Sequence, residues 1–276
     1  MAAPVTGPAL RAAERAWQDT VGHALQDRPF QSAGCRRVLA AQWARVLAPL
    51  AALPAGAVVL EVGAGAGHFL RQARIRFPSF TWVGLDLSRV GLEQAGPPVV
   101  QGDAEALPLH AGAVDAVVVN GALHHCPDVP QALREALGVL RPGGLLVLFE
   151  PVSSRFTRLV HRLVDPCLVR WVPYLSPADR HTLSTFCLSA HLPQLTASAD
   201  LLTLAYSDAF AYPLTGCYAA FSTPAWLLRA VLRAETWITG RQWGQALCDR
   251  LAWRVLVVAR RRACPSVAPW RCASRV

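Results

Sequence analysis

The hydrophobic pattern of this 276-residue chain changes its period near residue 58. Before that point, apolar side chains recur every three or four positions, which is typical of amphipathic helices. After it, short and nearly continuous apolar runs alternate with stretches of helical period. These runs occupy residues 58–62, 80–86, 98–103, 113–120 and 144–150. Because strands buried on both faces have this composition, the pattern predicts parallel strands connected by helices.

This alternation predicts an α/β fold with a doubly wound, Rossmann-like sheet. Further strands are expected near residues 200–208 and 253–259, which makes about seven strands in all. Helices are also expected at 154–171 and 177–192. The chain then divides into N-terminal helices at 1–57, a core at 58–151, a helical and aromatic insertion at 152–252, a final core strand at 253–262 and a tail at 263–276.

The composition narrows the class of protein. All 27 basic residues are arginine, so chemistry on a lysine side chain is excluded. Residues 152–276 carry fifteen arginines against six acidic residues, whereas residues 58–151 carry six arginines against nine. The eight cysteines are scattered without a CxxC pair, which predicts reduced thiols and no metal site. With no signal peptide or membrane span in view, we expect a cytoplasmic protein.

A glycine-rich motif, EVGAGAGH, follows the first apolar run. Gly63, Gly65 and Gly67 allow the backbone to turn sharply and to approach a ligand closely. His68 occupies the position at which a dinucleotide fingerprint has Gly or Ala, and a P-loop would need a lysine. Asp86 ends the second run, 19 residues after Gly67, where an acid can accept hydrogen bonds from ribose hydroxyls.

Two more motifs end the next two runs, GDA at 102–104 and NGALHHCPD at 120–128. The carboxyl ends of parallel strands form the binding crevice of an open α/β sheet. Together, the four motifs resemble class I S-adenosylmethionine-dependent methyltransferases of the small-molecule subgroup, which includes the ubiquinone and menaquinone biosynthetic enzymes. The resemblance covers about residues 58–151, and the strand at 253–259 matches the last, antiparallel strand of that family.

The resemblance implies S-adenosyl-L-methionine as the cofactor. The N-terminal helices lie outside the resemblance, and we expect them to cover the site. The cofactor-binding residues that it implies are Glu61, Gly63, Ala64, Gly65, Gly67, Asp86, Leu87, Asp103, Ala104, Asn120 and Gly121. Glu61 would order the glycine loop or reach the cofactor's amino group, and Asp86 would hold the ribose. Asp103 would accept a hydrogen bond from the adenine amino group. Solvated carboxylates at strand ends are the alternative for all three.

The catalytic and substrate residues are less specified. His124 and His125 follow the strand at 113–120, so one of them is a candidate general base, with a structural hydrogen bond as the alternative. Tyr212, Tyr218 and Phe221 in the insertion are candidate substrate contacts. Aromatic walls with few charges favour a small, fairly apolar acceptor of quinone, polyketide or lipid type. The alternative is that these rings fill the core of a lid.

Residues 223–238 predict an amphipathic helix with Trp226 and Trp237 on its apolar face and Arg229 and Arg233 on the other. Such a helix predicts a peripheral membrane contact through the basic C-terminal half, or a surface helix of a lid.

No nucleic-acid partner is expected, and the oligomeric state is not predicted. Three functions remain: a methyltransferase acting by in-line displacement, a catalytically silent cofactor-binding regulator, and a nicotinamide-dependent oxidoreductase, which His68 disfavours.

Overall fold

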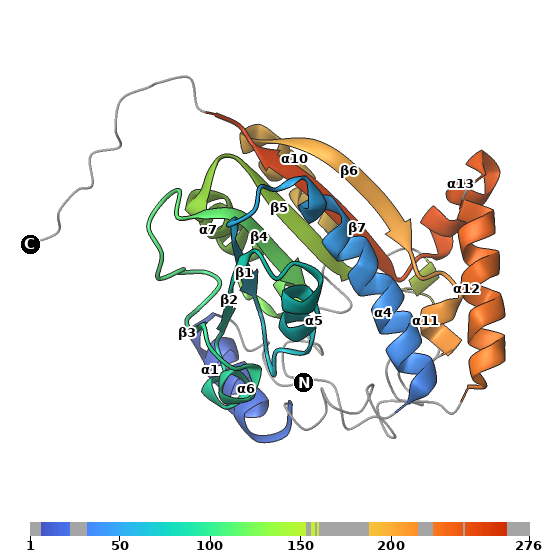
Figure 1. Ribbon diagram of the computed structural model, residues 1–276, viewed down its shortest axis with the longest axis horizontal. Coiled ribbons are helices and arrows are strands. Elements are labelled where there is room, and N and C mark those ends of the chain that lie inside the picture. Colours follow the sequence, from blue (N-terminus) through green and yellow to red (C-terminus); the bar gives the residue numbers. More distant parts are fainter. Residues whose placement is uncertain are drawn as a thin grey trace, which may run out of the picture.

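The computed structural model describes residues 7–22, 32–152, 156–157, 159, 188–214, 223–239 and 241–263. Its sheet has seven strands in the order β3-β2-β1-β4-β5-β7-β6 (Figure 1). Strand β7 pairs antiparallel with both β5 and β6, and the pairs from β3 to β5 are parallel. The predicted α/β sheet of about seven strands with an antiparallel last strand is therefore confirmed.

The strands lie close to the predicted apolar runs. They are β1 (Val58–Val62), β2 (Thr81–Asp86), β3 (Val99–Gln101), β4 (Val114–Asn120), β5 (Leu140–Pro151), β6 (Ala199–Ser207) and β7 (Arg254–Arg261). The strand expected at 144–150 begins earlier than predicted, because β5 starts at Leu140 and includes the Arg-Pro-Gly-Gly run at 141–144. A register shift opposite Val114 and Ala116 accommodates this run, and Gly143 adopts a positive φ of 80° there.

The helices follow the predicted alternation. They are α1 (Pro8–Trp17), η1 (Gln18–Gly22), α4 (Ala33–Leu47), η2 (Ala48–Ala52), α5 (His68–Arg76), α6 (Arg89–Ala95), η3 (Leu123–His125), α7 (Val129–Val139), α10 (Leu188–Ser198), α11 (Ala211–Leu214), α12 (Ala225–Thr239) and α13 (Gln242–Leu251). Ser88 and Asp128 cap α6 and α7 by accepting backbone N–H groups. The helices predicted at 154–171 and 177–192 fall largely outside the described residues, and α10 continues past the second one.

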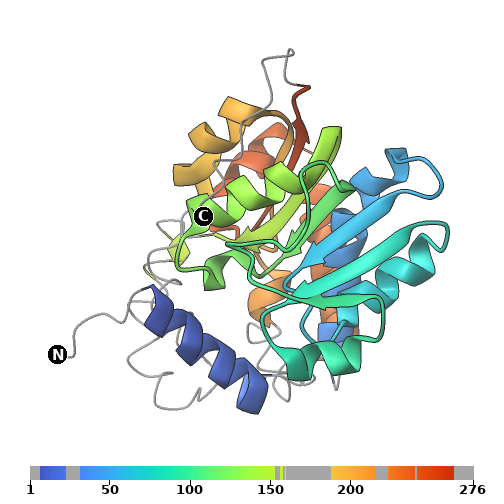
Figure 2. The ribbon, with the colours of Figure 1, turned by 90° about the vertical axis from the view of Figure 1, so that its left-hand side faces the viewer.

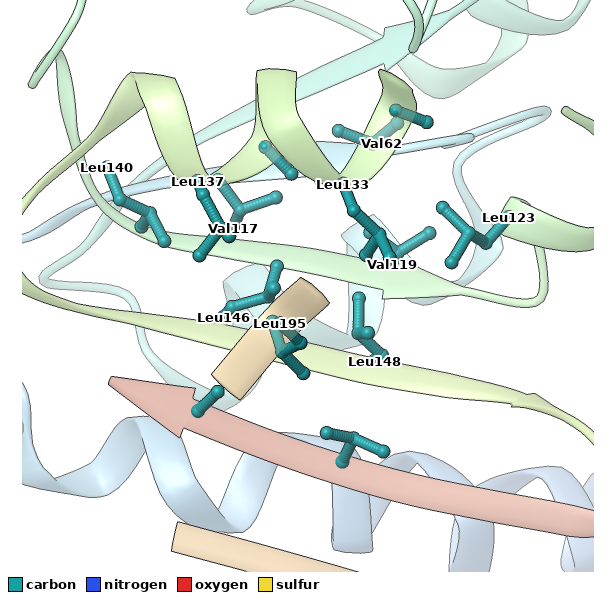
Figure 3. Close-up of a cluster of buried hydrophobic side chains, with 14 of the residues drawn as sticks. Val62, Val117, Val119, Leu123, Leu133, Leu137, Leu140, Leu146, Leu148 and Leu195 are labelled. Carbon is teal, nitrogen blue, oxygen red and sulfur yellow. The ribbon is translucent and has the colours of Figure 1, made fainter. Parts of the chain in front are cut away.

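Two layers of helices bury the faces of the sheet. Helices α7 and α10 cover one face, where Leu133 and Leu195 pack against Leu146 and Leu148 of β5 (Figure 3). Helices α4 and α5 cover the opposite face, where Val46 belongs to a second buried cluster. Helix α1 lies beside α6 at the carboxyl ends of the parallel strands (Figures 1 and 2). The carboxyl ends of the parallel strands are thus covered by the N-terminal helix α1.

Helix α12 packs against α4 and α11 through Leu228, which is fully buried. The prediction for its faces was wrong, because the side that contains Trp226 and Trp237 is exposed. Arg229 and Arg233 are exposed as well. The side that packs holds Leu228, Val231 and Leu232, which cluster with Val38 of α4 and Ala211 of α11. In the part of the chain that is described, no helix combines the length and the apolar character needed to cross a membrane.

Candidate functional site

The glycine loop after β1 is built for close backbone approach. Gly63, Gly65 and Gly67 have positive φ angles of 78°, 50° and 74°, which L side chains rarely adopt. The Gly63 N–H donates to the Leu85 carbonyl at 2.8 Å, so the loop starts beside the end of β2. A Cβ atom on Gly63 would lie 2.1 Å from Cβ of Ala122. The loops after β1 and β4 therefore touch, and only glycine fits between them.

Asp86 ends β2 and orders the glycine loop. Its Oδ2 accepts the Gly65 N–H at 2.7 Å and its Oδ1 accepts the Ser88 N–H at 2.8 Å. A carboxylate has about four lone-pair positions, so each oxygen retains capacity for a further donor. Burial raises the pKa of Asp86, and the two backbone donors oppose that rise. The next residue, Leu87, is half-buried at the same strand end.

Glu61 is a buried carboxylate beside this loop. Its side chain is only 2% exposed, and its Oε2 lacks a hydrogen-bond partner among the described residues. Burial, followed by the negative charge of Asp86, raises the pKa of Glu61 well above its usual range. Because an uncompensated buried carboxylate is costly, this position suits a ligand that brings a cation or hydrogen-bond donors. The carboxylate of Glu61, as a hydrogen-bond acceptor, therefore fits the ammonium group of the implied cofactor.

The loop after β4 is organised by a residue that the sequence did not reveal. Glu150, which is fully buried at the end of β5, accepts the N–H groups of Ala122 and Leu123 at 3.0 and 2.8 Å. Its Oε2 lies 2.8 Å from Nδ1 of His124. Gly121, with a φ of 72°, precedes this loop. The only available signal was an acid closing the apolar run GLLVLFE, which also fits a solvated strand end.

We expect Glu150→Gln to lower the free energy of unfolding by about 2 kcal/mol, because one of its two acceptor oxygens becomes an NH2 group facing other donors. Urea denaturation followed by circular dichroism measures this loss. Glu93→Gln is the matched control, since Glu93 is 63% exposed and its loss should change stability little. Equal stability of the Glu150→Gln and Glu93→Gln proteins would contradict the assignment.

The two candidate histidines lie together at this loop. His124 is buried, and its ring centroid is 4.1 Å from that of His125. Nδ1 of His125 lies 3.1 Å from Oε1 of Glu14 on α1. The contact of His124 with Glu150 supports a structural hydrogen bond for that ring, which is the alternative to catalysis. The general-base role of either histidine stays a prediction.

Helix α1 is tied to the strand ends by polar contacts. Arg11 contacts Glu105, a buried acid, and lies 3.5 Å from Oδ2 of Asp103. Just after α1, Asp19 accepts the Ser88 hydroxyl at 2.6 Å. These contacts join the N-terminal cover to the ends of β2 and β3. Arg11 and Glu105 carried no motif, so sequence reasoning missed both.

The predicted cofactor residues lie together in the structure, whereas only one of the three predicted substrate residues belongs to the described chain. The implied cofactor residues lie at the ends of β1 to β4 or in the loops that follow them; they are Glu61, Gly63, Ala64, Gly65, Gly67, Asp86, Leu87, Asp103, Ala104, Asn120 and Gly121. Tyr212, a predicted substrate contact, lies in α11, and its ring centroid is 6.2 Å from that of Trp253. Tyr218 and Phe221 lie outside the described residues. Within the described chain, no three His, Cys, Asp or Glu side chains form a metal site.

Arg254 is a further buried residue at this edge of the sheet. Its guanidinium lies 5.2 Å from the ring centroid of Tyr212 and 5.7 Å from that of Phe149. Its Nη1 is 3.6 Å from the position that a Cβ on Gly121 would take. The sequence placed Arg254 in the last predicted strand and in a basic C-terminal half, and it indicated no role for this side chain. The structure brings it to the predicted cofactor residues because β7 runs antiparallel and begins where β5 ends.

Residues 60–148 match the family model described as a methyltransferase domain. This segment is similar to methyltransferase domains, and the sheet that contains it has their Rossmann-like fold. The malonyl-[acyl-carrier protein] O-methyltransferase of Dechloromonas aromatica is 34% identical over 148 residues, which are 53% of this chain and 52% of that protein. The trans-aconitate 2-methyltransferase of Deinococcus radiodurans is 35% identical over 114 residues, 39% of this chain and 42% of that protein. The chain thus spans about half the length of the curated relatives it matches.

Solved structures extend the likeness beyond the methyltransferase domain. Geranyl diphosphate C-methyltransferase from Streptomyces coelicolor superposes with a TM-score of 0.66, covering 94% of this chain and 100% of that one at 15% identity. The [4+2]-cyclase SpnF superposes with a TM-score of 0.60, covering 95% of this chain and 100% of that one at 17% identity. At these identities the likeness concerns the fold. The two proteins are named for different reactions on this fold, so the chemistry has to be argued from the site.

Proposed function

We propose that this chain is an S-adenosylmethionine-dependent methyltransferase acting on a small, fairly apolar acceptor of quinone, polyketide or lipid type. The observation that carries the proposal is the buried Glu61 carboxylate beside the glycine loop, with one oxygen lacking a partner among the described residues. When bound, S-adenosylmethionine supplies an electrophilic methyl group on a sulfonium sulfur. The residues of the chain would bind the cofactor and the acceptor, orient them for in-line displacement and exclude water.

Each part of the loop cluster has a role in that binding. Glu61 would take the ammonium group, and the free lone pairs of Asp86 would accept the ribose hydroxyls. The glycine loop leaves room for the methionine part, because Gly63, Gly65 and Gly67 carry no Cβ and the side chains of Ala64 and Ala66 are buried. Gly121 would border the reacting centre, and α1 would close the site through Arg11. This cover limits the access of water to the methyl group.

The class of acceptor rests on the aromatic side chains near Gly121. Tyr212 and Trp253 are half-buried with their ring centroids 6.2 Å apart, and the Arg254 guanidinium lies 5.2 Å from the ring centroid of Tyr212. Flat, apolar walls favour a flat or apolar acceptor. The acceptors named for the relatives differ widely, so they do not narrow the choice. His124 and His125 remain the candidates for a general base where the acceptor must lose a proton.

The first test is titration calorimetry of the purified chain with S-adenosylhomocysteine, followed by mass spectrometry of a cell-extract reaction with methyl-labelled S-adenosylmethionine. We expect binding and a newly labelled small molecule. Binding without label in any extract fraction would favour the regulatory alternative. Binding of NADH in place of S-adenosylhomocysteine would favour the oxidoreductase alternative and overturn the proposal.

We expect the affinity for S-adenosylhomocysteine to rise as the pH increases toward the raised pKa of Glu61. Below that pKa the carboxyl of the free protein is protonated, and binding an ammonium group favours its ionised form, so binding releases a proton. In Glu61→Gln this part of the pH dependence should vanish, and the affinity at neutral pH should fall about tenfold. Calorimetry at several pH values compares the two proteins. Parallel pH profiles would contradict this role for Glu61.

We also propose a cytoplasmic location. Cys35 and Cys126 are free thiols, and Cys35 is buried. Cytoplasmic cysteines are ordinarily reduced, whereas cysteines of secreted proteins are usually paired. Thiol titration of the purified, unreduced protein should therefore detect free thiol groups after unfolding.

A further inference from the structure

The outer side of α12 is unusual for a surface helix. Trp226 and Trp237 are 65% and 57% exposed, and they are eleven residues apart, so they lie on the same side after about three turns. Leu228 and Glu235 lie on the opposite side and are 0% and 2% exposed. Glu235 accepts the N–H groups of Ala209 and Ala211, at 2.8 and 3.3 Å, and so fixes the rotation of the helix. The tryptophans are therefore held outward.

Helix α13 extends this surface. Trp243 is 58% exposed, and its ring centroid lies 6.4 Å from that of Trp237 in an edge-on arrangement. The Arg241 guanidinium lies 3.3 Å from the ring centroid of Trp237. Figure 1 shows α12 and α13 side by side at the end of the molecule opposite α1 and α6. We name the surface formed by Trp226, Trp237 and Trp243, with Arg229 and Arg233, the tryptophan face.

The charge of the tryptophan face has one sign. Arg229 and Arg233 are exposed on α12, and Arg250 is exposed on α13. Among the side chains described on these two helices, the single acid is Glu235, which is buried on the opposite side. Tryptophan rings favour the boundary between lipid headgroups and acyl chains, and nearby arginines are attracted by anionic headgroups.

We propose that the tryptophan face is a docking surface for an anionic phospholipid bilayer. The rings enter the headgroup region, and Arg229 and Arg233 contact lipid phosphates, with α12 lying in the plane of the membrane. A second copy of the chain is the less suitable occupant, because a symmetric contact would set arginines against arginines. This inference is independent of the methyltransferase proposal, since it uses no residue of the cofactor or acceptor site.

Vesicle co-sedimentation tests the proposal with the full chain. The probes are vesicles of phosphatidylcholine alone and of phosphatidylcholine with about one third phosphatidylglycerol. We expect binding to the anionic vesicles that weakens as salt is added, and little binding to the neutral ones. Arg229→Gln/Arg233→Gln should lower the partition coefficient about 30-fold. Arg89→Gln/Arg134→Gln removes two exposed arginines from other helices and is the matched control.

The apolar part has its own variant. Trp226→Ser/Trp237→Ser should also reduce binding strongly, whereas Ile75→Ser, which removes a 73% exposed apolar side chain on α5, should not. Unchanged circular dichroism and S-adenosylhomocysteine binding would show that the variants are folded. Vesicle binding that survives both α12 variants would place membrane affinity elsewhere and overturn the proposal. Self-association in light scattering that the tryptophan variant abolishes would assign the face to a second copy and overturn it too.

Discussion

Asp86→Ala is expected to weaken the binding of S-adenosylhomocysteine by at least about 100-fold, because charge-assisted hydrogen bonds to both ribose hydroxyls disappear together. The same change removes the acceptor of the Gly65 N–H, now held at 2.7 Å, so the glycine loop loses its support. Titration calorimetry gives the dissociation constant directly. The effect combines a lost ligand contact with a loosened loop, which is why we expect it to exceed the effect of Glu61→Gln.

Two further variants show whether the loss of affinity in Asp86→Ala comes from this carboxylate. Asp200→Ala removes a 58% exposed acid paired with Arg262 near the start of β6, and it should leave binding unchanged. Asp86→Asn keeps one acceptor oxygen and should recover part of the affinity. Tight binding by a folded Asp86→Ala protein would count heavily against the cofactor assignment.

Gly63→Ala is expected to abolish measurable binding of S-adenosylhomocysteine. The new Cβ would lie 2.1 Å from Cβ of Ala122, and the backbone φ of 78° is unfavourable for alanine. The loops after β1 and β4 would have to separate, and the binding edge would lose its shape. Calorimetry and thermal denaturation measure the two consequences.

Gly56→Ala separates conformational strain from contact. Gly56 has a φ of 82°, and nothing lies within 4 Å of its Cβ position, so this variant carries the strain alone. It should lose about 1 kcal/mol of stability and keep its affinity. Adding Ala122→Gly to Gly63→Ala removes the contact and should restore part of the binding. If Gly56→Ala and Gly63→Ala behave alike, the contact between the loops has no role.

Much of the fold and of the cofactor edge could be predicted, since those features depend on local chemistry. Apolar runs of the right length identified the strands, and Gly63, Gly65 and Gly67 marked positive φ angles. The start of β5 was placed too late, at residue 144, because the strand continues through a register shift that accommodates the proline and glycines at 142–144. The faces of α12 were assigned wrongly, because two tryptophans outweighed Leu228 in the pattern.

The roles of residues whose partners are distant in the sequence could not be predicted. Arg11 and Glu105 are 94 positions apart, and Glu150 meets Ala122 across 28 positions. Nothing in a local pattern distinguishes these acids and this arginine from solvated surface charges. Their roles arise only when folding removes them from water and leaves each with a particular partner.

Local patterns were enough to predict the alternation of strands and helices, the sharp turns at glycine and the acids at strand ends, because backbone sterics and hydrophobic period act over a few residues. Three features arise only in the folded chain: which polar groups meet at the strand ends, that α1 lies over them while α4 packs on a face of the sheet, and that α12 turns its tryptophans outward. Those outcomes depend on burial and on pairing between distant segments. Long-range packing settles such pairings, and short sequence patterns do not encode it.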